Sequence, residues 1–436
     1  MSTETDSDAG SDEHPEMTIA EVLRHRGVRP LLGVFFLSAT ASIMQAVALG
    51  AFVYDISGRT LDLGFLGLAE FAPSMLLVLV TGEVADRFDR RRVIRYAFIG
   101  ELVCAAGLLA YAASDPTAVW PIFVIVVGYG IARAFMAPSS RSLPANVAPP
   151  GGLQRVVAMY STTWQASSIA GPAIAGVLYA VDPTVPFIVI CGLIFAGFVL
   201  TFGLPDVRVK RAIAVDDDGV ELSDRPSLRS ALEGLSLVRR TPILLGAISL
   251  DLFAVLFGGA VFLIPAIVDR LGKGPEYQGW LRAGGGIGAS IMALVLIGRP
   301  FVRNIGKVLL AAVAVFGLAT IALGITRNFF VAFACIAILS AADMVSVFIR
   351  STLVPLATPD GTRGRVMAVE QVFIGASNEL GGAESGFAAS VLGTSGSIVA
   401  GGFATLVIVG AWWVLFPALR DVDRFSDVEH QVAGGG

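Results

Sequence analysis

Twelve long apolar runs constrain the fold of this chain more than any other feature of its sequence. Each run is close to the ~20 residues that an α-helix needs to cross the hydrocarbon core of a bilayer. The runs occupy residues 31–54, 62–81, 93–113, 118–140, 156–180, 185–204, 242–266, 279–298, 308–326, 329–352, 366–391 and 397–417. Charged residues make up only 15% of the 436, too few to cover several soluble domains. The sequence therefore predicts an all-α membrane protein with twelve transmembrane helices.

The basic residues are distributed among the loops in a way that predicts the topology. About 25 of the 31 lysines and arginines lie in the termini and in the loops that would share their side of the membrane. The loops on the other side hold four, which are Arg59, Arg270, Lys273 and Arg327. Because cytoplasmic loops carry the excess of Lys and Arg, we expect both termini in the cytoplasm.

The order of apolar and polar segments predicts five regions. We expect a disordered acidic tail over residues 1–20 and a six-helix bundle over 21–204. A cytoplasmic linker over 205–241 would join it to a second six-helix bundle over 242–420, and a short cytoplasmic tail would follow over 421–436. The end of the linker is either a helix lying on the inner membrane face or a plain solvated connection.

Two stretches suggest that the bundles are repeats of one another. Pro149 precedes Arg155 by the same spacing with which Pro359 precedes Arg365, and both pairs lie between the fourth and fifth spans of a half. Parallel repeats of this kind are typical of secondary transporters. We therefore predict two pseudo-symmetric halves.

A charged loop follows the second apolar run. Its glycine, acid and arginines lie in the order G-x-x-x-D-R-x-x-R-R, formed by Gly82, Asp86, Arg87, Arg90 and Arg91. This pattern resembles the loop between helices 2 and 3 of the major facilitator superfamily of secondary transporters. The alternative is an ordinary positive-inside loop of an unrelated membrane protein.

This loop is a candidate for the inner gate. Arg141, at the cytoplasmic end of the fourth span, would pair with Asp86 when the gate is shut. Alternatively, Asp86 would cap the helix that begins near Gly364, where the helix dipole favours an anion.

The fifth span carries a series of small residues around a proline, namely Ser167, Gly171, Pro172 and Gly176. The series resembles the antiporter motif of exporters in this superfamily. Small residues let two membrane helices approach closely, and the glycines of residues 284–288 in the eighth span would supply the other side. The alternative is general helix packing with no role in export.

Charged residues inside the spans are the main candidates for coupling. Since a charge in hydrocarbon costs roughly 2.5–3.5 kcal/mol on insertion scales, such residues tend to face a cavity or a partner. The candidate proton carriers are Glu70, Asp251, Asp343, Glu379 and Glu384, and the buried basic residues are Arg133 and Arg282. The alternative for any one acid is a structural ion pair, such as Asp343 with Arg350 on the same span.

A substrate cavity also needs apolar and aromatic lining. The candidates are Trp164, Phe253, Phe257, Phe373 and Asn378. The alternative for each of these residues, favoured when it is taken singly, is that it faces lipid or fills space between helices.

Longer matches refine the resemblance. They lie at residues 53–58, 132–138, 245–255, 341–352 and 375–381, and resemble the enterobactin-exporter-like branch, which also includes macrolide efflux proteins. The likeness covers most of residues 20–420. It implies a location in the bacterial inner (plasma) membrane and export driven by the proton gradient.

These observations predict a monomeric secondary transporter that exports a small amphipathic molecule, such as a drug or siderophore, in exchange for protons. The alternatives are a proton-coupled importer of a nutrient such as a sugar, and a membrane receptor or scaffold that transports nothing. The sequence shows no nucleophile–base set, no metal-ligand spacing and no P-loop. We therefore expect no enzyme activity, cofactor, metal or nucleic-acid partner.

Overall fold

The computed structural model describes residues 17–205 and 228–428. Within these ranges, the structure does not describe the side chains of residues 78, 79, 82, 83, 85–87, 137, 141, 142, 145, 228–231 and 360. The described chain is built from helices, and no strand occurs in it. This agrees with the all-α membrane fold expected from the apolar runs.

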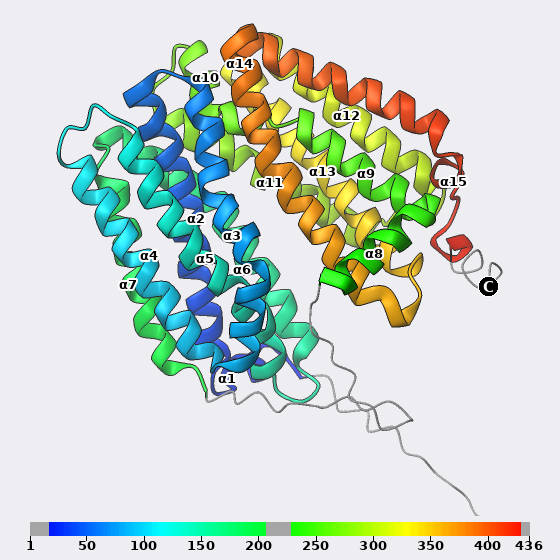
Figure 1. Cartoon of the computed structure of the whole chain (residues 1–436), viewed down its shortest axis with the longest axis horizontal. Coiled ribbons are helices and arrows are strands. Elements are labelled where there is room, and N and C mark those ends of the chain that lie inside the picture. The colour runs from blue at the N-terminus through cyan, green and yellow to red at the C-terminus, as the bar shows by residue number, and fades with distance from the viewer. Residues whose placement is uncertain (1–16, 206–227, 429–436) are drawn as a thin grey trace, which may run out of the picture.

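The first group of helices forms a bundle with its own core, drawn from blue to green in Figure 1. Its members are α1 (Ile19–Arg24), α2 (Val28–Ser57), α3 (Thr60–Arg87), α4 (Arg90–Ala112), α5 (Trp120–Val147), α6 (Leu153–Val181) and α7 (Val185–Leu200), followed by the 3-10 turn η1 (Thr201–Gly203). Below we call this group the first half.

The second group forms another bundle, drawn from green to red in Figure 1, with two clusters of buried apolar residues. Its members are α8 (Leu228–Arg240), α9 (Pro242–Phe257), η2 (Ala260–Leu263), α10 (Ile264–Arg270), α11 (Glu276–Gly298), α12 (Ile305–Ile325), α13 (Phe329–Leu356), η3 (Asp360–Thr362), α14 (Arg363–Leu415) and α15 (Pro417–Arg420). We call this group the second half.

Local chemistry sets several helix ends. Thr18 and Glu21 form a capping box at the start of α1, and Asn328 accepts backbone hydrogen bonds at the start of α13. Helix α2 stops at Gly58, whose φ of 62° is the left-handed conformation that glycine adopts at low cost. Helix α14 is interrupted at Gly393, where φ is 73° and ψ is 163°. Its 53 residues are therefore two helices.

Ten helices of the described chain are long and apolar enough to cross a membrane. One of these ten stretches runs through α9, η2 and α10, and another is the whole of α14. The two helices of α14, divided at Gly393, count as two spans, and the 29-residue α6 is long enough to be another. The helices are therefore compatible with twelve spans, which remains a prediction. The predicted tails and linker fall mainly on residues 1–16, 206–227 and 429–436, outside the described residues.

The two halves meet through two pairs of helices. Helix α6 contacts α11 at Gly176, where an added Cβ would lie 2.7 Å from the backbone nitrogen of Gly279. Helix α3 contacts α14 at Gly64, where an added Cβ would lie 2.9 Å from the Cα of Ala383. Glycine thus permits the close approach of the halves at both places.

These contacts lie toward one end of the molecule. At the end that carries α10, the Tyr54 hydroxyl donates to Asp269 at 3.4 Å and the Thr60 hydroxyl donates to the Gly386 carbonyl at 3.3 Å. Figure 1 shows the halves drawing apart toward the opposite end, which carries α1 and α8. We call these the α10 end and the α8 end.

We predict that Gly176→Ala lowers the thermal stability of the protein. The added methyl group would press on the backbone of α11, and such overpacking typically costs ~1–3 kcal/mol. The unfolding temperature, followed by a thiol-reactive dye that labels Cys335 as it becomes exposed, should fall by several degrees. Gly192→Ala in α7 is the control, because nothing lies within 4 Å of its added Cβ. Equal stability of the two variants would contradict the tight α6–α11 contact.

Candidate functional site

A cavity of about 270 Å³ lies between the two halves. Its walls come from α2, α3, α5 and α6 of the first half and from η2, α10, α11 and α14 of the second. The lining residues are Ser42, Ile43, Ala46, Val47, Leu49, Gly50, Leu63, Leu66, Gly67, Glu70, Arg133, Trp164, Phe262, Ile264, Pro265, Gln278, Arg282 and Glu379. A ligand in this cavity would therefore touch both halves at once.

Four charged side chains line the cavity, and two come from each half. Glu70 on α3 lies 4.0 Å from Arg133 on α5, measured from Oε1 to Nε. Arg282 on α11 and Glu379 on α14 face them from the second half, and the charge of Glu379 interacts with those of Glu70, Arg282 and Arg133. Two carboxylates and two guanidinium groups thus share one cavity. The sequence predicted each of them as a buried charge.

Arg133 is held by a polar network in the first half. Its Nη1 donates to the hydroxyl groups of Ser42 and Tyr129, and the Tyr129 hydroxyl donates to Ser42 at 3.1 Å. Glu101 on α4 is 1% exposed, and its charge interacts with those of Arg133 and Glu70. Among the described residues, Glu101 Oε1 has no hydrogen-bond partner. Arg133 therefore links α2, α3 and α5, with a second buried acid close by.

The apolar lining is only partly the one expected. Trp164 lines the cavity, and its ring lies 6.3 Å from that of Phe35 on α2. Phe262 in η2 and Gln278 at the start of α11 also line it, although the sequence did not single them out. Gln278 is 5% exposed, and its Oε1 has no hydrogen-bond partner within the described chain. Gln278 therefore carries a buried acceptor that no described residue uses, at the edge of the cavity.

The other predicted lining residues are not among those that border the cavity. Phe253 packs edge-on against Trp412, with ring centroids 5.6 Å apart. Phe257 and Phe373 pack against the core of the second half. Asn378 is exposed and donates to the carbonyl of Ile374 one turn earlier on its own helix. The sequence predicts that these residues lie in membrane helices. Whether a residue faces the cavity depends on how its helix packs against the others.

A second charged cluster lies inside the second half. Arg350 on α13 contacts Asp251 on α9, with 2.7 Å between Nη2 and Oδ1. It also lies 3.7 Å from Glu370 on α14 and donates to the Ser346 hydroxyl at 3.3 Å. The side chains of Arg350 and Asp251 are only 5% and 7% exposed. Arg350 thus connects three helices of the second half.

The partner of Arg350 differs from the one considered in the sequence. The ion pair considered there joined Arg350 to Asp343, but the structure joins it to Asp251 and Glu370. Asp343 borders a small void of about 10 Å³ together with Asp251. The two candidates Asp251 and Asp343 therefore lie together and apart from the cavity between the halves. Glu384 is half-buried and is not among the residues that line that cavity.

The gating loop is described only in part. The side-chain surroundings of Gly82, Asp86, Arg87 and Arg141 are not described, so their pairing stays a prediction. Arg90 begins α4.

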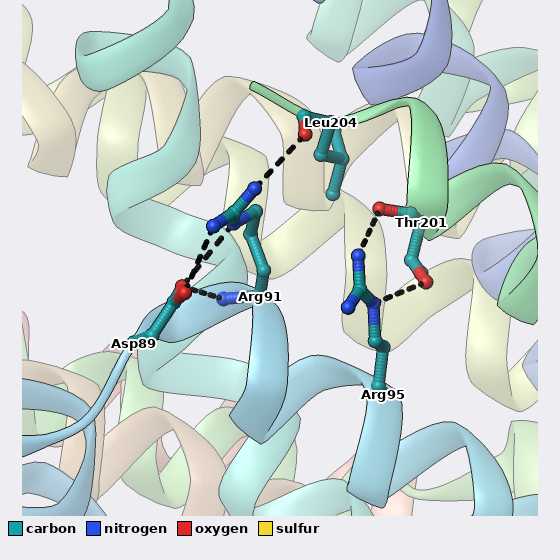
Figure 2. A network of polar contacts seen from close by, with 5 residues as sticks. All are labelled: Asp89, Arg91, Arg95, Thr201 and Leu204. Carbon is teal, nitrogen blue, oxygen red and sulfur yellow. Dashed lines mark hydrogen bonds and ion pairs between the residues drawn. The ribbon is translucent and has the colours of Figure 1, made fainter. Parts of the chain in front are cut away.

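Asp89 is the N-cap of α4. Its carboxylate accepts from the Arg91 backbone at 2.9 Å and from Arg91 Nη2 at 3.0 Å (Figure 2). Burial alone would raise the pKa of Asp89, but the hydrogen bonds from Arg91 and the charges of Arg91 and Arg92 hold it below its usual value. Asp89 is therefore an ionised cap of this helix.

Two arginines of α4 tie that helix to the end of α7. Arg91 donates to the carbonyl of Leu204 at 3.4 Å, and Arg95 donates to both the hydroxyl and the carbonyl of Thr201 at 3.2 Å (Figure 2). The Arg95 guanidinium also lies 4.3 Å from the centre of the Phe202 ring. These arginines satisfy carbonyls that the end of a helix leaves without partners.

The small residues of α6 face two neighbours. Ser167 is fully buried and its hydroxyl lies 3.0 Å from that of Thr40 on α2. Gly171 also faces α2, where an added Cβ would lie 3.1 Å from Ile43. Gly176 and the Pro172 carbonyl face Gly279 of α11. The motif therefore brings α6 against α2 and α11 together.

The glycines expected to pack on α6, those of residues 284–288 in α11, also face two different helices. Gly286 faces Ser168 of α6, whereas an added Cβ at Gly284, Gly285 or Gly288 would meet residues of α13. Gly279, which the sequence analysis did not include among them, makes the closest approach to α6. Contact between these helices was expected, and Gly286 is one of the expected glycines that permit it, but the tighter contact at Gly279 was not expected.

No group of three or more His, Cys, Asp or Glu residues in the described ranges is arranged to hold a metal ion. The cavity presents carboxylates, guanidinium groups, the Ser42 hydroxyl, an amide and apolar side chains. Such a set can bind a solute and exchange protons.

Comparison with known proteins identifies the family. The family model described as Major Facilitator Superfamily matches residues 31–347, which is more than half of the chain. The chain belongs to this superfamily. The resemblance inferred from the gating loop is therefore confirmed at the level of the family. Members of this superfamily are membrane carriers of small molecules, and the described chain has helices long and apolar enough to cross a membrane.

Several curated relatives are named as transporters or efflux proteins. The chain is 26% identical to the uncharacterized MFS-type transporter YfiS of Bacillus subtilis over 64% of each chain, which is slightly under two thirds of that relative. It is 24% identical to the multidrug efflux pump Tap of Mycolicibacterium fortuitum, over 91% of this chain and 98% of that one. It is also 24% identical to macrolide efflux protein A of Streptococcus pyogenes, over 51% and 52%.

Solved structures share the fold at low sequence identity. A bacterial homologue of the human lysosomal transporter Spinster superposes with a TM-score of 0.67 at 15% identity, covering 93% of this chain and 97% of that one. A peptide transporter of the POT family superposes with a TM-score of 0.71 at 12% identity, covering 93% and 96%. These likenesses show the major facilitator fold.

We predict that Asp251→Asn destabilises the protein strongly. The substitution leaves Arg350 with a weaker set of partners in a buried site, and breaking a buried ion pair typically costs ~3–5 kcal/mol. The unfolding temperature in detergent should fall well below that of the unchanged protein.

The control is the double variant Asp251→Asn/Arg350→Gln, which removes both charges and should recover part of the lost stability. A double variant that is as unstable as the sum of its two single changes would argue against direct coupling of the pair.

Proposed function

We propose that this protein exports a small amphipathic organic molecule in exchange for protons by alternating access. The observation that carries the proposal is the cavity between the halves, in which Glu70 and Arg133 of one half face Arg282 and Glu379 of the other. Because both halves contribute charges to this site, the interactions among those charges influence the relative arrangement of the halves.

The proposed coupling follows from the positions of the two cavity carboxylates. Glu70 and Glu379 belong to opposite halves, and like charges repel. Protonation of either carboxyl group removes that repulsion. The carboxylate that remains ionised then shares the attraction of Arg133 and Arg282 with no second anion. Proton loading would thereby shift the equilibrium between two arrangements of the halves. We place proton exchange at Glu70 and Glu379, and assign Asp251 a structural role because it is paired with Arg350.

The direction of transport is proposed from three observations. If both termini lie in the cytoplasm, the α8 end is cytoplasmic, and it is the end toward which the halves draw apart (Figure 1). This arrangement suits loading of a solute from inside. The series Ser167, Gly171, Pro172 and Gly176 on α6 resembles the antiporter motif of exporters. Relatives named as efflux or export proteins, including Tap and the tetracenomycin C resistance and export protein of Streptomyces glaucescens, support the same direction.

The proposed solute follows from the lining. Most lining residues are apolar, and two acids, two arginines and one amide add charge and hydrogen bonding. An amphipathic molecule that carries a charged or polar group fits this mixture. The drug and siderophore classes implied by the resemblance both contain such molecules.

The remaining parts of the proposal concern the whole protein. Residues 21–204 and 242–420 would act as the two moving bodies of a monomer in the bacterial inner membrane. Asp86, Arg87 and Arg141 would form the inner gate when the α8 end closes. The competing functions are a nutrient importer, and a receptor or scaffold that has no need of titratable groups in a shared cavity.

The proposal predicts that Glu379→Gln abolishes proton-coupled transport. The probes are erythromycin, tetracenomycin C and ethidium, each added to energised everted vesicles that contain a pH-sensitive dye. Addition of a transported probe should release protons from the vesicles, and accumulation of the probe should collapse with a protonophore. Glu379→Gln and Glu70→Gln should each lower coupled accumulation at least tenfold, since each removes one group that exchanges a proton.

Glu276→Gln is the matched control, because Glu276 begins α11 and is not among the lining residues. Accumulation should be unchanged in this variant. Accumulation by the unchanged protein that does not depend on the gradient would contradict antiport, and uptake in the opposite orientation only would favour the importer.

A further inference from the structure

A hollow of about 300 Å³ lies where α1 joins α2, at the α8 end of the first half. Four basic residues, Arg24, His25, Arg26 and Arg29, line it together with Leu23, Gly27, Pro30 and Gly203. All four basic residues are exposed. The transport mechanism proposed above makes no use of this surface, which we call the basic groove.

The backbone beneath the basic groove is firmly held. Val22 and Val28, on either side of the turn, are fully buried in the core of the first half. Gly27 has a φ of 106°, and an added Cβ there would lie 2.7 Å from Pro205. An added Cβ at Gly203 would lie 3.1 Å from Pro30. The turn is therefore wedged against the segment that follows α7, and its basic side chains project from a fixed base.

These basic side chains contrast with other arginines at helix ends. Arg91 and Arg95 are engaged by the end of α7, and Arg303 pairs with Asp423. No carboxylate of the described chain forms an ion pair with Arg26 or Arg29, whereas the charge of Arg24 interacts with that of Glu21. Two of the three guanidinium groups around the hollow, those of Arg26 and Arg29, thus lack an anionic partner in the described residues. Burial of α2 in a membrane would hold them at its surface.

We propose that the basic groove binds the phosphate headgroup of an anionic phospholipid of the surrounding bilayer. Guanidinium groups bind phosphate oxygens through paired hydrogen bonds, and several arginines beside a membrane helix match the charge of an anionic headgroup. Leu23 and Pro30 give the hollow an apolar side on which the glycerol and upper acyl carbons can pack. The position of the groove, directly beside the first residues of the membrane helix α2, favours a lipid over a free solute.

The test is a lipid titration of the full chain followed by native mass spectrometry. Diphosphatidylglycerol is the probe, because its two phosphates suit three arginines, and phosphatidylcholine with the same acyl chains is the comparison. We expect tighter binding of diphosphatidylglycerol. The variant Arg24→Gln/Arg26→Gln/Arg29→Gln should bind it roughly a hundredfold more weakly, since each arginine near an anionic lipid contributes about fivefold.

Two further variants keep the test decisive. Arg59→Gln/Lys273→Gln/Arg327→Gln removes the same charge at the α10 end and should leave binding unchanged. Arg24→Lys/Arg26→Lys/Arg29→Lys keeps the charge that membrane insertion uses but loses the paired hydrogen bonds, so it should bind more weakly than the unchanged protein.

Three results would overturn the proposal. The first is equal binding of diphosphatidylglycerol by the unchanged protein and the glutamine variant of the groove. The second is complete displacement of the lipid by an equal concentration of inorganic phosphate, which would mean a site for a free anion. The third is lipid binding only after deletion of residues 1–16, which would mean that the acidic N-terminal segment of the chain is the natural occupant.

Discussion

The interaction on which the rest of this structure depends is the neutralisation of arginines inside an apolar helix bundle. A guanidinium group in such a place is tolerated only with carboxylates and hydroxyls around it. Arg350 meets this condition with Asp251 at 2.7 Å and with Glu370, and thereby connects three helices of the second half. Arg133 meets it with Glu70, Ser42 and Tyr129. Each half thus has one arginine that fixes the relative positions of its helices. The difference between them is that Arg133 also faces the shared cavity, whereas Arg350 is enclosed.

The contacts between the halves are of another kind. They rely on glycine and on a few hydrogen bonds, such as that from Tyr54 to Asp269 at the α10 end and that from Gln165 of α6 to Ser290 of α11. Small residues allow close packing without interlocking side chains, so such a contact can open without breaking a buried ion pair. Rigid halves joined by a smooth contact are what a carrier of this superfamily requires in order to expose one cavity to two sides in turn. The cavity charges are then the natural place at which a proton can influence the contact.

The sequence predicted most of the fold and a smaller part of the site. Membrane helices follow from apolar runs of a length that the bilayer sets, so the helices lie close to the expected residues. Glu70 and Glu379 were predicted as buried charges because an acid in an apolar run is visible locally. Their meeting across the halves was not predictable in this way, since it depends on how two bundles rotate against each other. The same is true of Asp251, whose partner Arg350 lies 99 positions later in the sequence. Nothing in the local pattern around Phe253 distinguishes a ring that faces the cavity from one that packs on Trp412.

The most direct test of this account is a pair of spin-label distances across α6 and α11 in a cysteine-free background. One pair joins Leu153 to Ile297 at the α8 end, and the other joins Val181 to Trp280 at the α10 end, all four being exposed positions. The account predicts that acidification changes the two distance distributions in opposite directions, one shortening as the other lengthens, and that Glu70→Gln/Glu379→Gln removes this dependence on pH. Distances that stay constant with pH, or that lengthen and shorten together, would contradict rigid halves that move about a shared, titratable cavity.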